Sequence, residues 1–471
     1  MKAKNYRETV NKNPVFAKYG SPFLVSDSGK VTLNERAIAV ECATKNQVQY
    51  LPDTKTYERY DQDAGVWKLV HEKEVVKFLD DLLVELGKQH EQEEAVQRVG
   101  SAKLHSLCRM LQPLHINVKS EDLRGLVHVR NGVLDLKGSK SMLFDHDPKF
   151  GFKFASGVEY EAKAKCPKFI DKLLKPAIPD YDIELIQKYF GSALIGPNTS
   201  QNILLIRGTP GGGKGTLVSV IEKVLGERYV ADLRAKHLTG RFETSAFLGK
   251  RVLLGKDVPG DTLQERGARM LKSLVGGDLM QAEIKYNPAK QSIRGDYHVV
   301  LVANNHLRIT PDGDEEAWRR RLLIVDYNNP KPTKVIPEFA EKLFEEEASG
   351  ILNWLIEGAM EFRSDLKKNH GKLRLNPEQT ERINGMLHDS DSVQTFVDQR
   401  LSEVRKKDVS SDELLLGYFD LCKERKWTPV SSHLFQTRVP DLVAQKFQVC
   451  RRNDIMRDGK AVRGFKHISL N

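Results

Sequence analysis

Cysteine is scarce in this chain, and its placement excludes the usual zinc and disulfide frameworks. Five cysteines are scattered over 471 residues, and no two form a Cys-x-x-Cys pair. No histidine pair stands at zinc-finger spacing, so a structural zinc is not expected. An odd, scattered set of thiols is typical of a reducing compartment. The sequence therefore predicts free thiols in a cytoplasmic protein.

Long apolar runs are also missing. No stretch approaches the roughly 20 apolar residues of a membrane span, and residues 1–10 lack the apolar segment of a signal peptide. With 40% hydrophobic and 29% charged residues, the composition excludes a mainly disordered, collagen-like or coiled-coil chain. We expect a globular protein without a membrane partner, in about three domains.

Positive charge is in modest excess. The chain carries 74 Lys and Arg against 64 Asp and Glu, a net charge of +10. Spread over this length, the excess does not separate a nucleic-acid-binding protein from other basic enzymes. Its distribution is more informative, because residues 393–471 hold 15 Lys and Arg against 10 Asp and Glu.

Apolar runs alternate with helical patterns between about residues 200 and 330. Residues 202–206 form a continuous apolar run, as in a buried parallel strand, and a helical pattern follows at 217–225. Further apolar runs lie at 251–254, 298–303 and 322–325. This alternation predicts an α/β core.

A glycine-rich loop follows the first of these runs. Gly208-x-x-x-x-Gly213-Lys214 has P-loop spacing between a strand and a helix. Its backbone N–H groups and the helix N-terminus would hold phosphates, and Lys214 would reach the β- and γ-phosphates. The residue after the lysine, normally Ser or Thr, is Gly215, and the hydroxyl falls on Thr216, which would contact either Mg²⁺ or a phosphate. The expected nucleotide-binding residues are Gly208, Gly211, Gly212, Gly213, Lys214, Gly215 and Thr216.

Three polar signals follow the loop. Asp257 ends an apolar run 43 residues after Lys214, where a carboxylate can hold Mg²⁺. Asn304 and Asn305 end the next run, where an amide can position a water. Three arginines at 319–321 precede the last run, where a guanidinium can act on a neighbouring subunit's phosphates.

In this order, the motifs resemble those of the superfamily 3 helicases of phages, plasmids and large DNA viruses. The subgroup is the poxvirus- and satellite-phage-type primase-helicases. The resemblance covers roughly residues 60–471. It rests on segments 208–216, 250–259, 271–278, 302–309 and 317–327, with 130–135 and 166–169 resembling the region before the ATPase.

The resemblance implies an AAA+-like P-loop ATPase that uses ATP and Mg²⁺ in a homo-hexameric ring. Such rings translocate 3′ to 5′ on single-stranded DNA. By resemblance, Asp257 is the Walker B carboxylate and Asn305 the sensor. Arg321 lies at the position of the finger that acts in trans, with Arg320 as the fallback.

Two segments are candidates for DNA binding. An Asn287-Pro288 turn flanked by Lys285, Tyr286 and Lys290 suggests a hairpin tip, and in the resembling family a hairpin here follows one DNA strand. The C-terminal unit has three helical patterns and two strand-like arms, at 448–452 and 461–466, which predict a winged helix. Its candidate DNA contacts are Arg451, Arg452, Lys460 and Arg463. Winged helices also serve as protein-docking modules, and that alternative stays open.

A primase centre is not expected. Its two metals need paired carboxylates, and none of the four Asp-x-Asp triplets, beginning at 145, 180, 312 and 389, follows a strand pattern. A separate primase or polymerase would then be a partner.

The predicted fold class is α/β, in four parts. These are an α+β N-terminal domain (1–165), an ATPase with a helical collar at its start (166–335), a helical lid and linker (336–385) and a winged helix (386–471). The predicted function is a replicative helicase of a phage, plasmid or other mobile element, acting on forked DNA. Two alternatives remain: an ATP-dependent DNA-binding regulator or loader, and a nucleoside monophosphate kinase, whose loops also read Gly-Lys-Gly-Thr.

Overall fold

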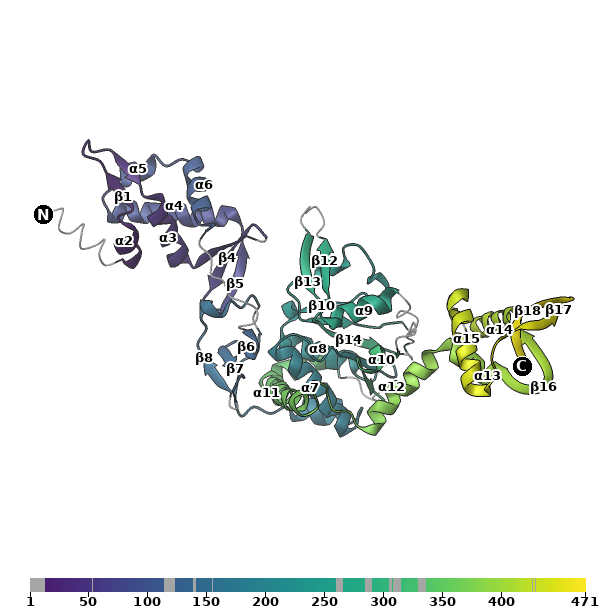
Figure 1. Ribbon diagram of the computed structural model, residues 1–471. Coiled ribbons are helices and arrows are strands. Elements are labelled where there is room, and N and C mark those ends of the chain that lie inside the picture. The colour runs from purple at the N-terminus through teal and green to yellow at the C-terminus, as the bar shows by residue number, and fades with distance from the viewer. Residues whose placement is uncertain are drawn as a thin grey trace.

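The computed structural model describes most of the chain. The described residues are 13–52, 54–113, 123–138, 141–154, 156–259, 266–283, 290–304, 307, 315–328, 336–425, 427 and 429–471. Figure 1 shows an elongated arrangement, with the N-terminal region and the C-terminal unit at opposite ends of a central region.

The N-terminal region mixes helices with antiparallel strands. Its elements are α2 (Pro14–Tyr19), β1 (Phe23–Val25), β2 (Val31–Leu33), α3 (Glu35–Asn46), β3 (Val48–Leu51), β4 (Thr56–Asp61), β5 (Val66–Val70), α4 (Glu72–Gln89), α5 (Glu93–Gln97) and α6 (Ser101–Met110). The apolar side chains that recur at helical spacing in α4 are buried. They form one core with α3 and α6.

A small antiparallel sheet connects this region to the centre. It contains β6 (Leu126–Val129), β7 (Gly132–Asp135) and β8 (Met142–Phe144). The β6–β7 hairpin has Val129 opposite Gly132, so its two turn residues are Arg130 and Asn131. Apolar residues of β6 and β7 belong to the same core as the central helices, so the connector is packed onto the central region.

The central region is built on a parallel five-stranded sheet. The strands are β9 (Ile203–Arg207), β10 (Val230–Asp232), β11 (Val252–Gly255), β14 (His298–Ala303) and β15 (Leu322–Asp326). Their order is β10-β11-β14-β9-β15, with every neighbouring pair parallel. The α/β expectation is therefore confirmed for the core.

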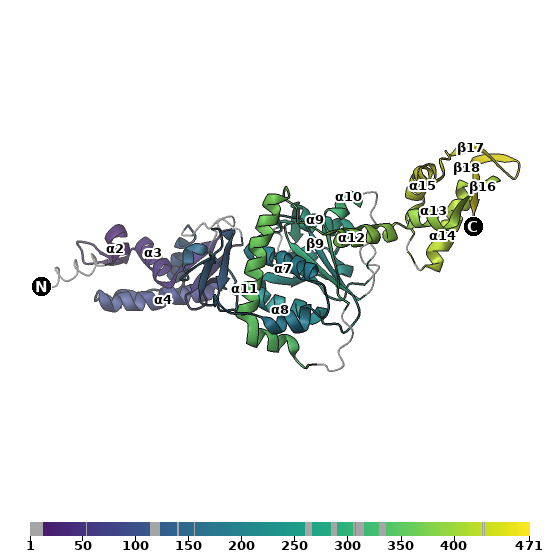
Figure 2. The same cartoon turned by 90° about the horizontal axis from the view of Figure 1, so that it is seen from below.

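Helices cover both faces of this sheet. The helices of the region are the π-helical turn η3 (Phe169–Leu174), α7 (Asp180–Ile195), α8 (Lys214–Leu225), α9 (Arg266–Gly276), α10 (Glu315–Arg319) and α11 (Phe339–Lys368). Leu204 and Ile206 face the core formed with α7, α8 and α11, which Figure 2 shows on one side of the sheet. Ile203 and Leu205 face the core formed with α9. Burial on both faces explains why the parallel strands are continuously apolar.

The segment expected as a helical lid and linker, 336–385, is largely helical. Helix α11 continues to Lys368, and α12 (Pro377–Ser390) follows. The segment has a polar composition because α12 buries only one stripe, Ile383, Met386 and Leu387, against the central region. On the same helix, Arg382 donates to the carbonyl of Ile324 in β15, which fixes α12 to the sheet.

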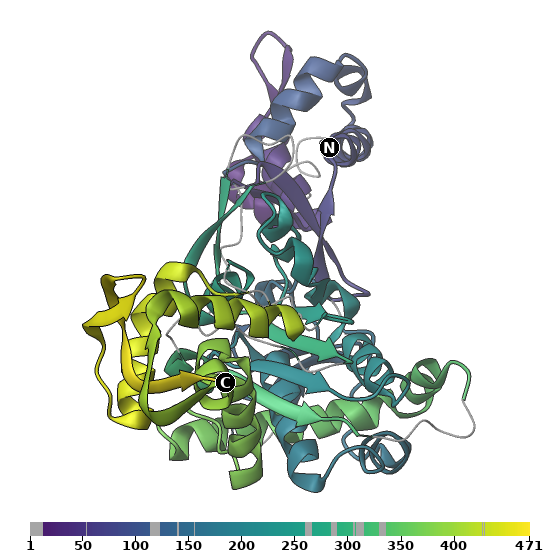
Figure 3. The same ribbon diagram turned by 90° about the vertical axis from the view of Figure 1, so that its right-hand side faces the viewer.

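The C-terminal unit lies beyond α12, nearest the viewer in Figure 3. It contains α13 (Ser392–Arg400), β16 (Leu401–Ser410), α14 (Ser411–Glu424), α15 (Ser432–Phe447), β17 (Arg452–Arg457) and β18 (Lys460–Leu470). Strand β16 was not expected, and β17 begins where the arm expected at 448–452 ends. The strands form an antiparallel sheet in the order β16-β18-β17 around a shared core with the three helices.

Candidate functional site

The glycine-rich loop lies at the carboxyl edge of the central sheet. It leaves β9 after Arg207 and enters α8 at Lys214. The Gly208 N–H donates to the carbonyl of Ala303 at the end of β14, over 3.3 Å. Crevices at this edge, where the strand order places β9 between β14 and β15, are the usual ligand sites of open α/β sheets.

Three of the loop glycines are required by geometry, and one of them, Gly211, has φ of 81°. Gly208 has φ of 154°, and a β-carbon there would lie 2.0 Å from the Tyr327 carbonyl oxygen. Gly213 has φ of 103°, a left-handed conformation that glycine adopts without strain. The loop therefore runs close to neighbouring backbone at its start and turns sharply into the helix at its end.

The side chain of Lys214 lies over this loop. Its Nζ donates to the carbonyls of Gly208 and Thr209, at 2.9 and 2.8 Å. Burial lowers the pKa of Lys214, and the negative charge of Asp257 acts in the opposite direction. The ammonium group is thus held at the N-terminus of α8 by two carbonyl oxygens, and the charge of Asp257 acts on it.

Asp257 and Asn304 meet at the same edge. Asn304 Nδ2 donates to the Asp257 carboxylate over 3.1 Å. Asp257 has φ of 53°, which Asp tolerates better than most residues. The next N–H, of Val258, donates to the Val302 carbonyl at 2.8 Å and fixes the turn. The expected sensor Asn305 lies outside the described residues.

The positions after Lys214 differ in their surroundings. A β-carbon on Gly215 would meet nothing within 4 Å, so a side chain fits there. Thr216 is half-buried in the first turn of α8. Crowding therefore does not explain why Gly215 stands where a Ser or Thr usually follows the lysine, with the hydroxyl at Thr216 instead.

The arginine run lies at the opposite, amino edge of the sheet, before β15. Arg321 is only 8% exposed, and its Nη1 donates to the Ala317 carbonyl at 2.9 Å. Arg320 is exposed. Arg319 donates to Asn384 of α12 and pairs with Glu316. The three neighbouring cations therefore have three different surroundings.

The hairpin expected before β14 is present. Strands β12 (Leu279–Glu283) and β13 (Lys290–Arg294) pair antiparallel, with Glu283 opposite Lys290. Lys285 and Tyr286 of its tip, and the side chain of Lys290, lie outside the described part of the chain. The hairpin rises from the amino edge of the sheet, because β14 begins four residues after β13 ends.

A neighbouring segment adds two residues that the sequence interpretation missed. Arg241 donates to the carboxylate of Glu283, the last residue of β12, over 2.6 Å. Its guanidinium lies 5.4 Å from the Phe242 ring centre. Phe242 is 43% exposed. An adjacent Arg-Phe pair in a loop has no spacing signal, and only the fold brings it beside the hairpin.

The basic residues of the C-terminal hairpin are not equivalent. Arg452 pairs with Asp454 at 2.8 Å, and Arg451 donates to the Gln436 carbonyl. Lys460 and Arg463 are exposed, with no ion pair to another described residue. The four predicted contacts therefore include one that is already neutralised.

Three carboxylates of the Asp-x-Asp triplets cap helical turns or pair with arginines. Asp147 caps a short turn, and the buried Asp182 pairs with Arg382 of α12. Asp391 caps α13 and pairs with Arg438 of α15. Across the described residues, no group of three or more His, Cys, Asp or Glu is arranged to hold a metal ion. In the same part of the chain, no helix is both long and apolar enough to cross a membrane.

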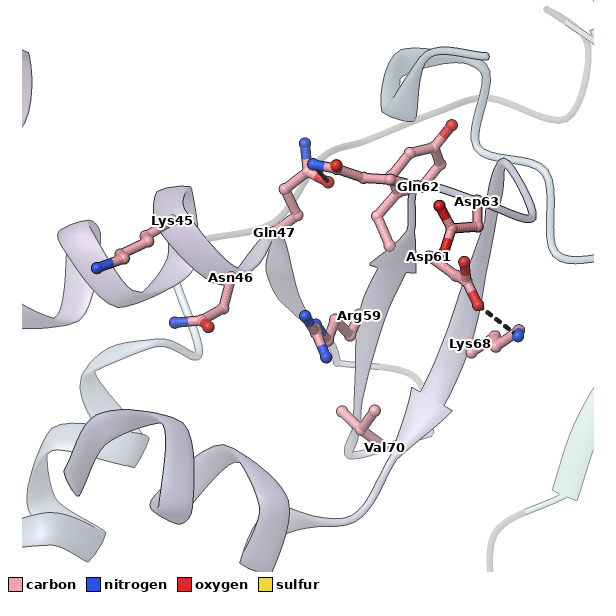
Figure 4. Close-up of a pocket in the computed structure, with 10 residues that line it drawn as sticks. Lys45, Asn46, Gln47, Arg59, Asp61, Gln62, Asp63, Lys68 and Val70 are labelled. Atoms are coloured by element: carbon pink, nitrogen blue, oxygen red, sulfur yellow. Dashed lines mark hydrogen bonds and ion pairs between the residues drawn. The ribbon is translucent and has the colours of Figure 1, made fainter. Parts of the chain in front are cut away.

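The N-terminal region contains an open hollow of about 470 Å³ (Figure 4). Its cations are already engaged: Lys68 pairs with Asp61, Lys45 pairs with Glu85, and Arg59 lies 5.0 Å from the Phe78 ring centre. Two of its three cations are therefore paired with carboxylates, and the third lies over an aromatic ring.

Two segments of the chain match family models. Residues 36–178 match the family described as "D5 N terminal like", and residues 206–321 match "Family of unknown function (DUF5906)". The second match spans the glycine-rich loop, Asp257 and the arginine run. Together they are consistent with the phage primase-helicase type of replication protein that the sequence motifs resemble. A search of curated proteins found no match.

Solved structures also resemble this chain. The A-form apo structure of the NrS-1 C-terminal region has 12% identity and a TM-score of 0.48, covering 88% of this chain and 87% of that chain. Another apo structure of the same region has 12% identity and a TM-score of 0.47, covering 93% of this chain and 99% of that chain.

Proposed function

We propose that this chain is an ATP-driven replicative DNA helicase of the superfamily 3 type. The observation that carries the proposal is the carboxyl edge of the central sheet. There, Lys214 at the N-terminus of a helix lies within the field of Asp257, which accepts a hydrogen bond from Asn304. A cation, a carboxylate and an amide beside a glycine-rich turn are the groups that nucleoside triphosphate hydrolysis requires.

The residues at this edge fit a Mg²⁺–nucleotide substrate. The loop from Gly208 to Gly213 would present backbone N–H groups to phosphates, and Lys214 would exchange its two carbonyl acceptors for phosphate oxygens. Thr216 and Asp257 would hold the metal, whose charge would offset that developing on the phosphates. Asn304 would orient the Asp257 carboxylate.

The position of the arginines supports a ring of identical chains. β15 is five residues long, so about 16 Å separates the arginine run from the loop edge. An arginine there cannot reach the phosphates of its own chain. We assign the trans contact to Arg320, because it is exposed, whereas the buried Arg321 holds the turn before β15.

DNA would be bound by two parts of the chain. The β12–β13 hairpin, with Lys285, Tyr286 and Lys290, would follow one strand with 3′ to 5′ polarity, and Arg241 and Phe242 lie beside it. The C-terminal unit has the helix and strand order of a winged helix and would contact duplex DNA ahead of the fork. A separate primase or polymerase would supply the primers.

Unwinding of a forked duplex, with and without ATP, tests the proposal. The wild-type chain should separate the strands only when ATP and Mg²⁺ are present. Binding without strand separation would indicate a regulator or loader instead. Consumption of AMP, with two ADP formed from each AMP and ATP and no phosphate released, would indicate a nucleotide kinase.

The hairpin gives a matched variant for this assay. Lys285→Ala together with Lys290→Ala should leave ATP hydrolysis without DNA within about twofold and abolish unwinding, because the lost charges contact phosphates. Normal unwinding by this variant would exclude the hairpin as the moving contact.

A further inference from the structure

The unexpected strand β16 contains a wide, basic bulge. Its register against β18 shifts between Glu403 and Asp408, so the four residues 404–407 oppose the single residue His467. Three of the four, Arg405, Lys406 and Lys407, are consecutive and exposed. Bulges re-aim side chains away from the regular alternation of a strand.

Local hydrogen bonds fix the shape of this bulge. The Lys406 N–H donates to His467 Nδ1 at 3.2 Å, and the His467 N–H donates to the Asp408 carboxylate at 3.3 Å. Lys406 and His467 both have positive φ, 67° and 61°. Left-handed conformations at two non-glycine residues cost energy and persist where the surroundings hold them.

The same hydrogen bonds leave cationic and donor groups turned outward. Because His467 Nδ1 accepts a hydrogen bond, the ring proton resides on Nε2, which is then a donor. Within the described residues, no carboxylate pairs with Arg405, Lys406 or Lys407, and Asp408 is engaged by the His467 backbone. On the opposite edge strand, by contrast, Arg452 is paired with Asp454 and Arg457 with Glu413.

We propose that the β16 bulge is a phosphate-binding site for double-stranded DNA, separate from the β17–β18 wing. The inference rests on the proposed DNA-binding function of the C-terminal unit. Three unneutralised cations on a fixed backbone suit a repeating polyanion, which they can contact without reading sequence.

The position of the bulge sets which phosphates it contacts. Lys460, at the wing, and His467, at the bulge, are seven residues apart in β18, which is about 24 Å in an extended strand. Phosphates of one DNA strand advance about 3.4 Å along the axis per nucleotide. Wing and bulge would therefore contact phosphates up to about seven nucleotides apart, so the unit would occupy a longer duplex than the wing alone.

The test measures how duplex affinity of the full chain depends on salt. The probe is a blunt duplex of about 20 base pairs without ATP. Arg405→Gln together with Lys407→Gln removes two cations and leaves the hydrogen-bonded Lys406 and His467 in place. The slope of log affinity against log salt should fall in magnitude by about 1.8, and affinity at moderate salt by about tenfold.

Matched controls are available in the same unit. Lys423→Gln removes one exposed lysine from α14, beside Glu424, and should leave the slope unchanged. Lys407→Gln alone, with the same loss of charge, should reduce it by about 0.9. Arg463→Gln removes a cation from the wing. In phosphate ethylation interference, the wing variant and the bulge variant should each lose interference at a different set of DNA phosphates.

The outcomes separate this inference from the broader proposal. If the wild-type chain binds no duplex, the C-terminal unit is not a DNA-binding module and the proposed function fails there. If the wild-type chain binds and Arg463→Gln weakens binding while the Arg405 and Lys407 double variant does not, only the bulge assignment is overturned. The basic residues would then protect a strand edge or contact an acidic protein.

Discussion

The two edges of the central sheet differ in their functional side chains and in whether those side chains contact one another within one chain. The carboxyl edge brings together Lys214, Asp257 and Asn304 within one chain, through one hydrogen bond and one electrostatic contact. The amino edge carries the arginine run and the base of the β12–β13 hairpin, about 16 Å away. The residues of the carboxyl edge meet within a single chain, whereas we propose that the amino edge acts on a neighbouring chain.

The largest expected loss of ATP hydrolysis comes from a substitution at the carboxyl edge. Lys214→Ala removes the cation that lies over the loop, so ATP hydrolysis should fall by about 100-fold or more. The variant loses two hydrogen bonds to carbonyl oxygens, but it also removes a charged ammonium group whose burial is unfavourable, so the thermal midpoint should change little. Steady-state phosphate release together with a melting curve measures both, and near-normal hydrolysis would remove this edge as the site.

A smaller but more diagnostic effect is expected at the amino edge. Arg320→Ala should reduce hydrolysis about tenfold to 100-fold without loss of stability, because the side chain is exposed. Arg321→Ala should instead cost about 2 kcal/mol of unfolding free energy, because it removes a buried hydrogen-bonded group.

Mixing decides whether that arginine acts in trans. Rings formed from Lys214→Ala and Arg320→Ala chains should regain part of the activity, since some interfaces would combine two intact halves. Absence of any recovery across all mixing ratios would mean that the two edges do not share a site.

A third comparison lies within the loop. Thr216→Ala should lower hydrolysis about tenfold if its hydroxyl holds the metal. Gly215→Ser should leave hydrolysis within about threefold and raise the thermal midpoint slightly, because the site has room and glycine is unfavourable in a helix. If adding Gly215→Ser to the Thr216→Ala variant restores ATP hydrolysis, a hydroxyl at either position can hold the metal. Hydrolysis rates measured across a Mg²⁺ titration test this.

The smallest effect concerns stability and pH at the amino edge. Burial lowers the pKa of His298, the first residue of β14, to about 3, and Arg251 contributes in the same direction. His298 is thus neutral when folded, so its contribution is intact above about pH 6.5 and declines as pH falls toward 3. His298→Gln should make the unfolding free energy, measured by urea titration, depend less on pH below about 6.5. An unchanged pH dependence would exclude His298 as a source of the loss of stability in acid.

Much of this molecule was predictable because its signals are local. The glycine spacing before Lys214 and the apolar strands each follow from a few consecutive residues. The β12–β13 hairpin was likewise expected from a turn sequence. Less local features were missed: β16 has mixed composition and pairs with a strand about 60 residues away, and α12 appears polar because only one stripe is buried.

The sequence by itself determined the α/β class, the glycine-rich turn and the candidate residues, because hydrophobic period and glycine spacing act over short distances. Tertiary structure decided which candidates meet and which remain available. It joined Asn304 to Asp257, buried Arg321 while exposing Arg320, and paired Arg452 while leaving Arg405 and Lys407 without a described counter-charge. Those outcomes depend on contacts between distant segments, where exposure and charge pairing are set by packing rather than by neighbours in the chain.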